Sequence, residues 1–479
     1  MVLLAHFMLH AAHLVAFAAA MGNAVDEMCD YKLMTQSIDH FGRNNNTFPQ
    51  RYSIFTDHFR PGGPILLFQG EESTFLDCAN TTVMMWFAEK LGGMAVSLEH
   101  RYFGQSLPFA NNSYSNENFK FLTLDNVMAD AVSFVEMLQK TIPGAQSSKS
   151  IVASGSYGGL LATAFRQNHP ATFFGSIAAA GPTLAATAAS PTIEPDQFLW
   201  RSYGSQAYMD RSKEASTKIK DALNYIQSVI ESGNTTTLQQ ELQLCTAPPK
   251  NSLLSIITIQ QLYVAGFSGA VEFNYASARP GRTYIARPFD RVIDIALKAE
   301  TPTQLLNSSL WLWYEPQGYK CIDWADPTFA QKSTPLIQWA PWSYITCTYV
   351  PLCTTDALEG TIFPPLEGSC STRSESCAQK YNATLLTQEQ FWGDYHLSTE
   401  ELNNSTRIIF SVAEYDPTTA VVGANPPLTA DPCRSRRLYA SDMAHREELF
   451  YPTDGDKPEV VSLRNKELEI MKEWLENCG

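Results

Sequence analysis

The sequence predicts an α/β fold in which a mainly parallel sheet carries a large helical insertion. Three observations on the 479-residue chain support this prediction. Strand-like apolar runs alternate with amphipathic helical runs as far as "GSIAAAGP" (175–182), helical spacing dominates residues 186–335, and a strand-like run returns in "STRIIFSV" (405–412). Alternating strands and helices favour a parallel sheet, because each parallel crossover needs a connecting helix.

The elements before the insertion follow one another in a regular order. Two short strands are predicted in "GGPILLFQGEEST" and "GGMAVSLEHRYFGQS", and each ends in a polar loop that contains glycine. Between them, "TTVMMWFAEKL" has helical spacing through Met85, Ala88 and Leu91. An amphipathic helix over residues 123–141 comes next and is followed by a strand at Ile151–Ala153.

The insertion and the end of the chain are predicted to be helical for the same reason. Apolar residues spaced four, three and four apart predict one helix of the insertion, at Ile219, Leu223, Ile226 and Ile230. The chain closes with the amphipathic run "LRNKELEIMKEWLENCG", whose inward face is predicted to carry Leu468, Met471 and Leu475.

The first residues indicate an exported protein. The run "MVLLAHFMLHAAHLVAFAAA" is apolar and ends in small residues, so we expect a signal peptide over residues 1–24, with an uncleaved anchor as the alternative. No later stretch is expected to cross a bilayer. Eight Asn-x-Ser/Thr sequons support export and are expected glycosylation sites, at Asn45, Asn80, Asn111, Asn234, Asn307, Asn382, Asn403 and Asn404.

Cysteine content and charge indicate the compartment of the protein and exclude some classes of partner. The ten cysteines lack the paired CxxC spacing of a zinc site and predict several disulfides, whose pairing the sequence leaves open. A formal charge of −15 argues against nucleic acid or an anionic membrane as a partner, because both would repel the chain. We therefore expect a protein that is secreted or resides in a lysosome or vacuole.

The segment "IVASGSYGGLLA" (151–162) is typical of a nucleophile elbow, a sharp turn from strand to helix. Ser156 lies at the turn, and small residues are needed around it because the strand and the helix cross closely. The usual pattern is Gly-x-Ser-x-Gly, whereas here Ser154 occupies the first small position, before Gly158. The backbone N–H of Tyr157, at the helix N-terminus, is a candidate oxyanion donor.

Two further residues complete a candidate catalytic triad. In this type of fold the acid and then the base follow the serine along the chain. Asp416 comes just after the returning strand, in "AEYDP", where α/β folds assemble their sites. His445 is the one histidine that follows Asp416, 29 residues later, so it is the candidate base. In that arrangement no metal or organic cofactor is required.

Eight segments resemble, in chain order, the motifs of a family of serine peptidases that comprises lysosomal Pro-X carboxypeptidase, dipeptidyl peptidase II and fungal prolyl peptidases. They are "IDHFGRNNNTFPQRY", "GGPILLF", "EHRYFGQSLPF", "GSYGGLLA", "WSYITCT", "FWGDYHLSTEELNNSTRIIF", "EYDP" and "MAH". The resemblance spans nearly the whole chain after the expected signal peptide. The segment "EHRYFGQSLPF" is especially specific, because it is long and of mixed chemistry.

The resemblance implies an α/β-hydrolase fold with a mainly helical cap inserted after the nucleophile elbow. It implies cleavage of peptide bonds on the carboxyl side of proline, so the expected partners are proline-containing peptides. The expected divisions are a signal peptide (1–24), a first hydrolase part (25–185), the cap (186–335) and a second hydrolase part (336–479). No nucleic acid, cofactor or, after signal removal, membrane is expected.

Carried over by position, Ser156 matches the family nucleophile, Asp416 the acid and His445 the base. The loop "FQGEE" matches the region after the earlier strand, so the backbone N–H of Gly70 or Glu71 is a candidate second oxyanion donor.

The chain departs from the family pattern at three positions near the predicted site. Thr418 stands where a Trp commonly follows the Asp-Pro, Tyr349 replaces a Glu after "WSYITCT", and Arg446 replaces a second His after the base. These replacements leave the triad intact and bear on the subsite preference. Glu99 and Arg101, within "EHRYFGQS", are expected to form a structural ion pair under the site.

Two other functions remain as alternatives at this stage. An esterase or lipase could use the same scaffold, because a fold does not fix the substrate. A secreted, non-catalytic glycoprotein could retain the fold, although it would have no need of all three triad residues. The residues also leave open endo- or exopeptidase action, the pH optimum and the oligomeric state, with a dimer as one alternative.

Overall fold

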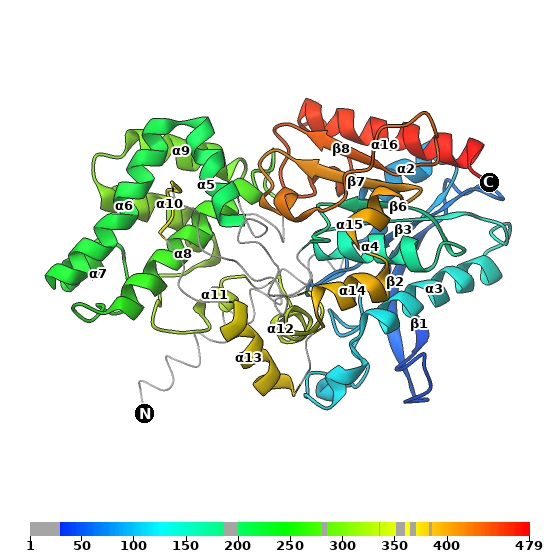
Figure 1. Ribbon diagram of the computed structural model, residues 1–479, viewed down its shortest axis with the longest axis horizontal. Coiled ribbons are helices and arrows are strands. Elements are labelled where there is room, and N and C mark those ends of the chain that lie inside the picture. Colours follow the sequence, from blue (N-terminus) through cyan, green and yellow to red (C-terminus); the bar gives the residue numbers. More distant parts are fainter. Residues whose placement is uncertain are drawn as a thin grey trace.

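The computed structural model describes residues 29–184, 200–279, 285–334, 336–350, 360–364, 370–382 and 386–479 (Figure 1). The expected signal peptide (1–24) and the expected start of the insertion at residue 186 lie outside the described residues.

Among the described residues, eight strands form one sheet in the order β1-β2-β4-β3-β5-β6-β7-β8. β1 pairs antiparallel with β2, and β2 pairs antiparallel with β4, while the remaining pairs are parallel. The strands are β1 (Lys32–Ser37), β2 (Thr47–Phe55), β3 (Ile65–Gln69), β4 (Met94–Leu98), β5 (Ser150–Gly155), β6 (Phe173–Ala179), β7 (Ile408–Ala413) and β8 (Arg436–Ala440).

Helices cover both faces of the sheet, which explains why its central strands are apolar on both sides. In β3, Ile65 and Leu67 belong to the core beneath α3 (Leu124–Thr141) and α4 (Tyr157–Asn168). Leu66 and Phe68 alternate with them and pack on the opposite side, with α2 (Val83–Leu91) and α16 (Pro458–Asn477).

The helices between β6 and β7 include a separate cap, drawn in green beside the sheet in Figure 1. Its own apolar core contains Ile219, Leu223, Ile226 and Ile230, all fully buried, as their spacing predicts. The cap helices are α5 (Trp200–Arg211), α6 (Lys213–Ser232), α7 (Thr235–Glu241), α8 (Leu253–Glu272), α9 (Pro288–Lys298), α10 (Pro302–Tyr314) and α11 (Phe329–Lys332). The sheet and this cap confirm the α/β-hydrolase fold.

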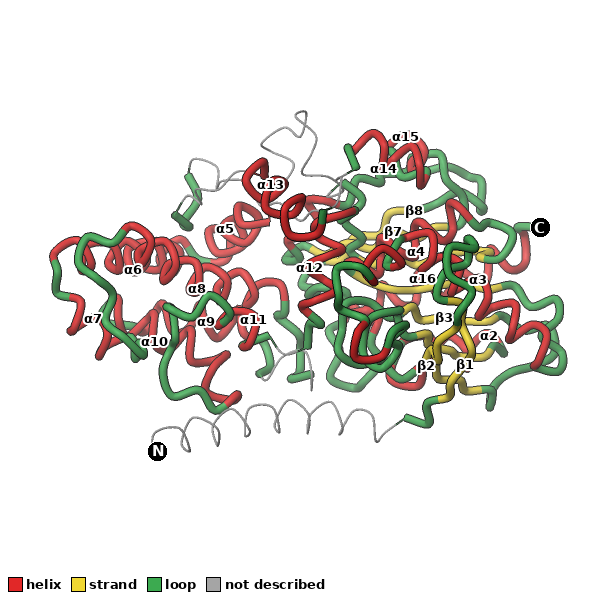
Figure 2. Tube along the Cα trace, turned by 90° about the horizontal axis from the view of Figure 1, so that it is seen from below, coloured by secondary structure: helices red, strands yellow, loops and turns green. Residues whose placement is uncertain are grey.

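After the cap, the chain returns to the sheet through a further group of short helices, which Figure 2 shows beside α4 and between the two parts. They are α12 (Trp339–Thr348), α13 (Cys370–Tyr381), α14 (Gln388–Tyr395) and α15 (Thr399–Asn403).

The helix expected from "TTVMMWFAEKL" is α2, whose buried face carries Met84 and Phe87, while Met85 and Leu91 are only partly buried. One inward position of α16 differs from the sequence-based expectation. In α16, Trp474 rather than Leu475 fills the inner position beside Met471, because Gly175 of β6 leaves room for its ring. Spacing alone gives the period of a helix but not the exact direction of its neighbours.

We expected no stretch after the signal peptide to be long and apolar enough to cross a bilayer. By these two criteria, length and composition, the expectation is wrong. Helix α8 is long and apolar enough to do so, and more than half of its most apolar window is buried. Its buried side chains, among them Ile259, Val264 and Phe267, belong to the cap core. A core helix of a soluble protein passes the same test.

Among the described residues, four disulfides support the prediction from cysteine content. They join Cys29 to Cys78, Cys245 to Cys321, Cys347 to Cys377 and Cys433 to Cys478. The last one ties the end of α16 to the segment before β8, and Cys245–Cys321 closes a loop within the cap.

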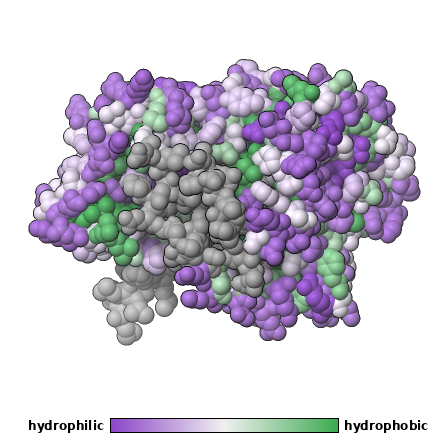
Figure 3. Space-filling view, in the orientation of Figure 1, coloured by the Kyte–Doolittle hydropathy of each residue, from purple (hydrophilic) through white to green (hydrophobic). Residues whose placement is uncertain are grey.

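The surface suits an exported chain. The face drawn in Figure 3 is mostly hydrophilic, and apolar side chains reach it in small separate groups. Of the eight sequon asparagines, Asn45, Asn111, Asn234, Asn382 and Asn404 are exposed, while the other three are partly buried.

Candidate active site

Ser156 lies at the turn between β5, which ends at Gly155, and α4, which begins at Tyr157. Its φ of 57° and ψ of −128° are a strained conformation for a residue with a side chain. The turn is held by a hydrogen bond from the Ser156 N–H to the Ala179 carbonyl of β6 (2.9 Å). Ser156 is partly exposed within a run of buried residues, so the backbone strain serves to present its hydroxyl.

The crossing of strand and helix is as close as the elbow pattern predicts. A Cβ added to Gly158 would lie 1.9 Å from Ser154 Oγ, and one added to Gly159 would lie 2.6 Å from the Ala179 carbonyl oxygen. Ser154 is accommodated at the first small position because its hydroxyl donates to the Gln69 carbonyl (2.8 Å). No buried hydroxyl is therefore left without a partner there.

The structure brings Asp416 and His445 together. Asp416 follows β7, and its Oδ2 lies 2.8 Å from His445 Nδ1. Both residues are buried, with exposures of 0% and 3%. Asp416 Oδ1 is held by the Thr418 N–H (2.9 Å) and by the Thr418 hydroxyl (2.6 Å), which also lies 3.3 Å from His445 Nδ1. These bonds leave Nε2 as the ring nitrogen that faces away from Asp416.

The electrostatics around His445 come from both the hydrolase domain and the cap. Glu272, the last residue of α8, has its Oε1 4.0 Å from His445 Nε2. Burial lowers the pKa of His445, but the charge and hydrogen bond of Asp416 and the charge of Glu272 outweigh it. The pKa of His445 is therefore raised above its ordinary value of 6.5.

Ser156 is connected to this pair through its neighbours. Arg446, the residue after the histidine, packs on Gly155, where an added Cβ would lie 2.5 Å from its Cδ. Among the described contacts, no hydrogen bond joins the Ser156 hydroxyl to His445. Catalytic hydrogen bonds are often long before substrate binds, so the lack of this bond among the described residues does not exclude a triad.

The candidate oxyanion donors are not equivalent. The N–H of Tyr157 is in the first turn of α4, where backbone donors have no partner within the helix. The N–H of Gly70 donates to the Leu98 carbonyl (2.8 Å), which disfavours Gly70, and the identity of the second donor stays a prediction. The Glu71 carboxylate pairs with Arg446 (Oε1 to Nη2, 2.5 Å), which links this loop to the residue after the histidine.

The ion pair expected between Glu99 and Arg101 is wrong. Glu99 pairs with Arg51 of β2 (2.5 Å), and Arg101 pairs with Asp130 of α3 (2.6 Å). Both pairs are buried, so the interpretation of these residues as structural fits, with other partners.

His100, which lies between Glu99 and Arg101 in the sequence, contacts Tyr157, the residue after Ser156. Its Nε2 lies 3.0 Å from the Tyr157 hydroxyl, which is 3.3 Å from that of Tyr349. Burial lowers the pKa of His100 to about 4, so this histidine is neutral at pH 7.

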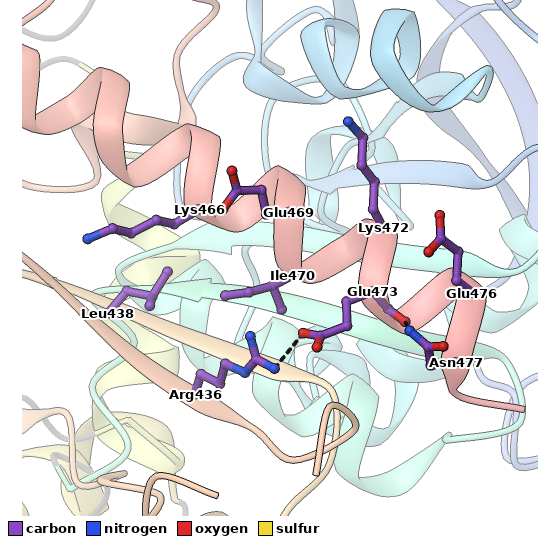
Figure 4. A pocket seen from close by; sticks show the side chains of 9 residues that line it. All are labelled: Arg436, Leu438, Lys466, Glu469, Ile470, Lys472, Glu473, Glu476 and Asn477. Carbon is purple, nitrogen blue, oxygen red and sulfur yellow. Dashed lines mark hydrogen bonds and ion pairs between the residues drawn. The ribbon is translucent and has the colours of Figure 1, made fainter. Parts of the chain in front are cut away.

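Other parts of the described chain are poorer candidates for a site. Figure 4 shows a groove between α16 and β8, where Arg436 pairs with Glu473 (2.5 Å). Ser156, Asp416 and His445 do not line it. Within the described residues, no group of three His, Cys, Asp or Glu side chains is arranged to hold a metal ion.

Sequence reasoning missed Glu272 and the contact role of Thr418. Glu272 is 173 residues from His445 along the chain (445 − 272), so no local pattern joins them. The sequence identifies Thr418 as a departure from the family pattern, but it does not predict the hydrogen bonds of Thr418 to Asp416.

Comparison with known proteins identifies the family to which the chain belongs. The sequence matches the family described as Serine carboxypeptidase S28 over residues 36–467. Lysosomal Pro-X carboxypeptidase of Mus musculus is 29% identical over 457 residues, which cover 92% of this chain and 88% of that protein. A probable extracellular serine carboxypeptidase of Arthroderma benhamiae is 30% identical over 166 residues, 31% of this chain and 22% of that protein. The solved proline iminopeptidase of Mycobacterium smegmatis covers 93% of this chain and 99% of its own, at 12% identity and a TM-score of 0.35.

Proposed function

Since the chain belongs to the serine carboxypeptidase S28 family and is therefore a serine-type peptidase, we propose that it cleaves on the carboxyl side of proline. Ser156 is the nucleophile, His445 the base and Asp416 the acid of this proposal. The observation that carries it is the buried Asp416–His445 pair (2.8 Å) next to a strained serine at a strand-to-helix turn. The proline preference is supported by the relatives named Pro-X carboxypeptidases.

The proposed mechanism follows from these positions. His445 Nε2 takes the proton of Ser156 as the serine oxygen attacks the peptide carbonyl carbon. Asp416 holds the Nδ1–H tautomer and stabilises the imidazolium that forms. The oxyanion is held by the Tyr157 N–H, with the Glu71 N–H as the second donor. The imidazolium then protonates the leaving amine, and water activated by His445 hydrolyses the acyl-enzyme.

The site of action proposed is the lysosome or vacuole, or the extracellular space. The four disulfides in the described part of the chain support an oxidising compartment. Relatives carry the words lysosomal and extracellular in their names.

The central test compares wild type with Ser156→Ala and Ser176→Ala. Ser176 is a matched control, because it is a buried serine of the neighbouring strand β6 and its hydroxyl has no hydrogen-bond partner. The substrate is a peptide with one internal proline, and mass spectrometry of the fragments identifies the bond and the direction of cleavage. A fluorophosphonate probe reports the reactive serine.

We expect S156A to lose labelling and about 10⁶-fold in kcat, whereas S176A keeps both. Retained hydrolysis by S156A would overturn the nucleophile. Labelled wild type that cleaves p-nitrophenyl esters and ignores the peptide would overturn the substrate and favour an esterase. Glycosylated wild type that takes no label would overturn catalysis altogether.

A further inference from the structure

The last residue of cap helix α8 and the segment just after it bind both main-chain polar groups of His445, its N–H and its carbonyl. The His445 N–H donates to the Glu272 carbonyl (2.8 Å), and the Tyr275 hydroxyl donates to the His445 carbonyl (3.1 Å). Tyr275 is fully buried, and its ring also packs edge-on against Phe450 (5.4 Å between centroids). Both the N–H and the carbonyl oxygen of the proposed base are therefore hydrogen-bonded to the cap rather than to the loop that carries the base.

The same cap segment is joined to the histidine loop at further points. The Ala276 N–H donates to Glu447 Oε1 (3.0 Å), and Lys457 Nζ donates to the Asn274 carbonyl (2.8 Å). The ring of Phe273 stands edge-on to the His445 ring, with centroids 6.2 Å apart. Four consecutive residues of the cap, 273–276, thus each contact the region around the base.

The histidine loop needs external support of this kind. Asp442 and Arg446, which flank the histidine, both have positive φ values (44° and 47°) although neither is glycine. Such conformations cost of order 1–3 kcal/mol each and persist only where the surroundings impose them. Contacts from outside the loop are therefore required to keep the imidazole in one place.

We infer that residues 272–276 of the cap are a positioning element for the base, and that the Tyr275 hydroxyl is its principal side-chain contact. The inference rests on the proposed function of His445. Tyr275 acts through His445 and does not touch the reacting atoms itself.

The test is Tyr275→Phe with Tyr208→Phe as the matched control. Both tyrosines are fully buried in the cap region and each donates to a backbone carbonyl, Tyr208 to Phe267 of α8 (2.9 Å). Each phenylalanine keeps the ring and removes one comparable hydrogen bond, so the two variants match in structural damage. Only Tyr275 bonds to His445.

We expect Y275F to lower kcat on the proline peptide by about 10- to 100-fold, with KM changed less than about twofold, because small misplacements of a catalytic group are costly. The acid limb of its kcat–pH profile should move to lower pH, because a displaced imidazole loses part of the Asp416 interaction that raises its pKa. Y208F should keep kcat within about twofold and an unchanged pH profile.

Two outcomes separate this inference from the proposed function. If wild type takes fluorophosphonate at Ser156 and Y275F matches Y208F in kcat and in pH profile, the positioning role is overturned while the triad stands. If wild type takes no label, the proposed function fails first. Should Y275F not fold, Phe273→Leu removes the ring contact with His445 and carries the same expectation, and a wild-type pH profile there overturns the inference.

Discussion

Replacing Arg446 by methionine tests whether the buried link between the histidine loop and the loop after β3 stabilises the site. Arg446 Nη2 and Glu71 Oε1 are 2.5 Å apart, and the side chains are 6% and 3% exposed. Removing one partner of such a pair leaves the other charge buried and costs about 3–5 kcal/mol. At about 2.1 cal/mol/K per residue, the unfolding entropy of the 479-residue chain is about 1 kcal/mol/K. Dividing the lost free energy by this entropy predicts that the Tm falls by about 3–5 °C.

Scanning calorimetry at one pH in non-reducing buffer measures this change, with Arg436→Met as the matched control. Arg436 and Glu473, whose pairing Figure 4 shows, are also 2.5 Å apart, but their side chains are 28% and 39% exposed. That pair is therefore worth about 0–1 kcal/mol, and its loss should leave the Tm within about 1 °C. The double variant E71Q/R446M should recover at least half of the loss. Equal Tm values for R446M and R436M, or no recovery in the double variant, would refute the reasoning.

Three further predictions concern catalysis and pH. Thr418→Val removes the hydroxyl that donates to Asp416 (2.6 Å), so kcat should fall about tenfold in steady-state assays with KM unchanged. Because the proposed base His445 can take a proton only when it is neutral, and its pKa is raised, kcat/KM should increase as pH rises through that pKa. Glu272→Gln should shift this limb to lower pH. Burial and a neighbouring carboxyl raise the pKa of Glu467 well above 4.5. The contribution of Glu467 to the free energy of unfolding is full below pH 4.5 and is lost as pH rises through its folded-state pKa. Glu467→Gln should therefore raise the Tm near pH 7 and leave it unchanged in acid.

Local chemistry made much of the site predictable. β5, the turn at Ser156 and α4 follow one another directly along the chain, so their pattern can be predicted without tertiary information. Asp416 and His445 followed from the chain order that the fold imposes, and the structure brings them to 2.8 Å. The partners of Glu99 and Arg101 could not be predicted, because they come from β2 and α3, far away in the chain.

The contacts of the cap with the base were hidden for a different reason. The His445 N–H bonds to a backbone carbonyl, that of Glu272, which any residue could supply. The Tyr275 hydroxyl likewise reaches a main-chain oxygen. Because main-chain partners carry no residue-type signature, neither contact leaves a motif, and only the folded arrangement reveals them.

The three departures from the family pattern have one property in common in the structure. The Thr418 hydroxyl holds Asp416, the Arg446 guanidinium holds Glu71, and the Tyr349 hydroxyl lies 3.3 Å from that of Tyr157. Each of these three side chains therefore contacts a residue of the candidate site. Substitutions of this kind change how firmly the proposed acid Asp416, the loop after β3 and the elbow are held, so we expect them to alter kcat and its pH dependence before they alter which peptide binds.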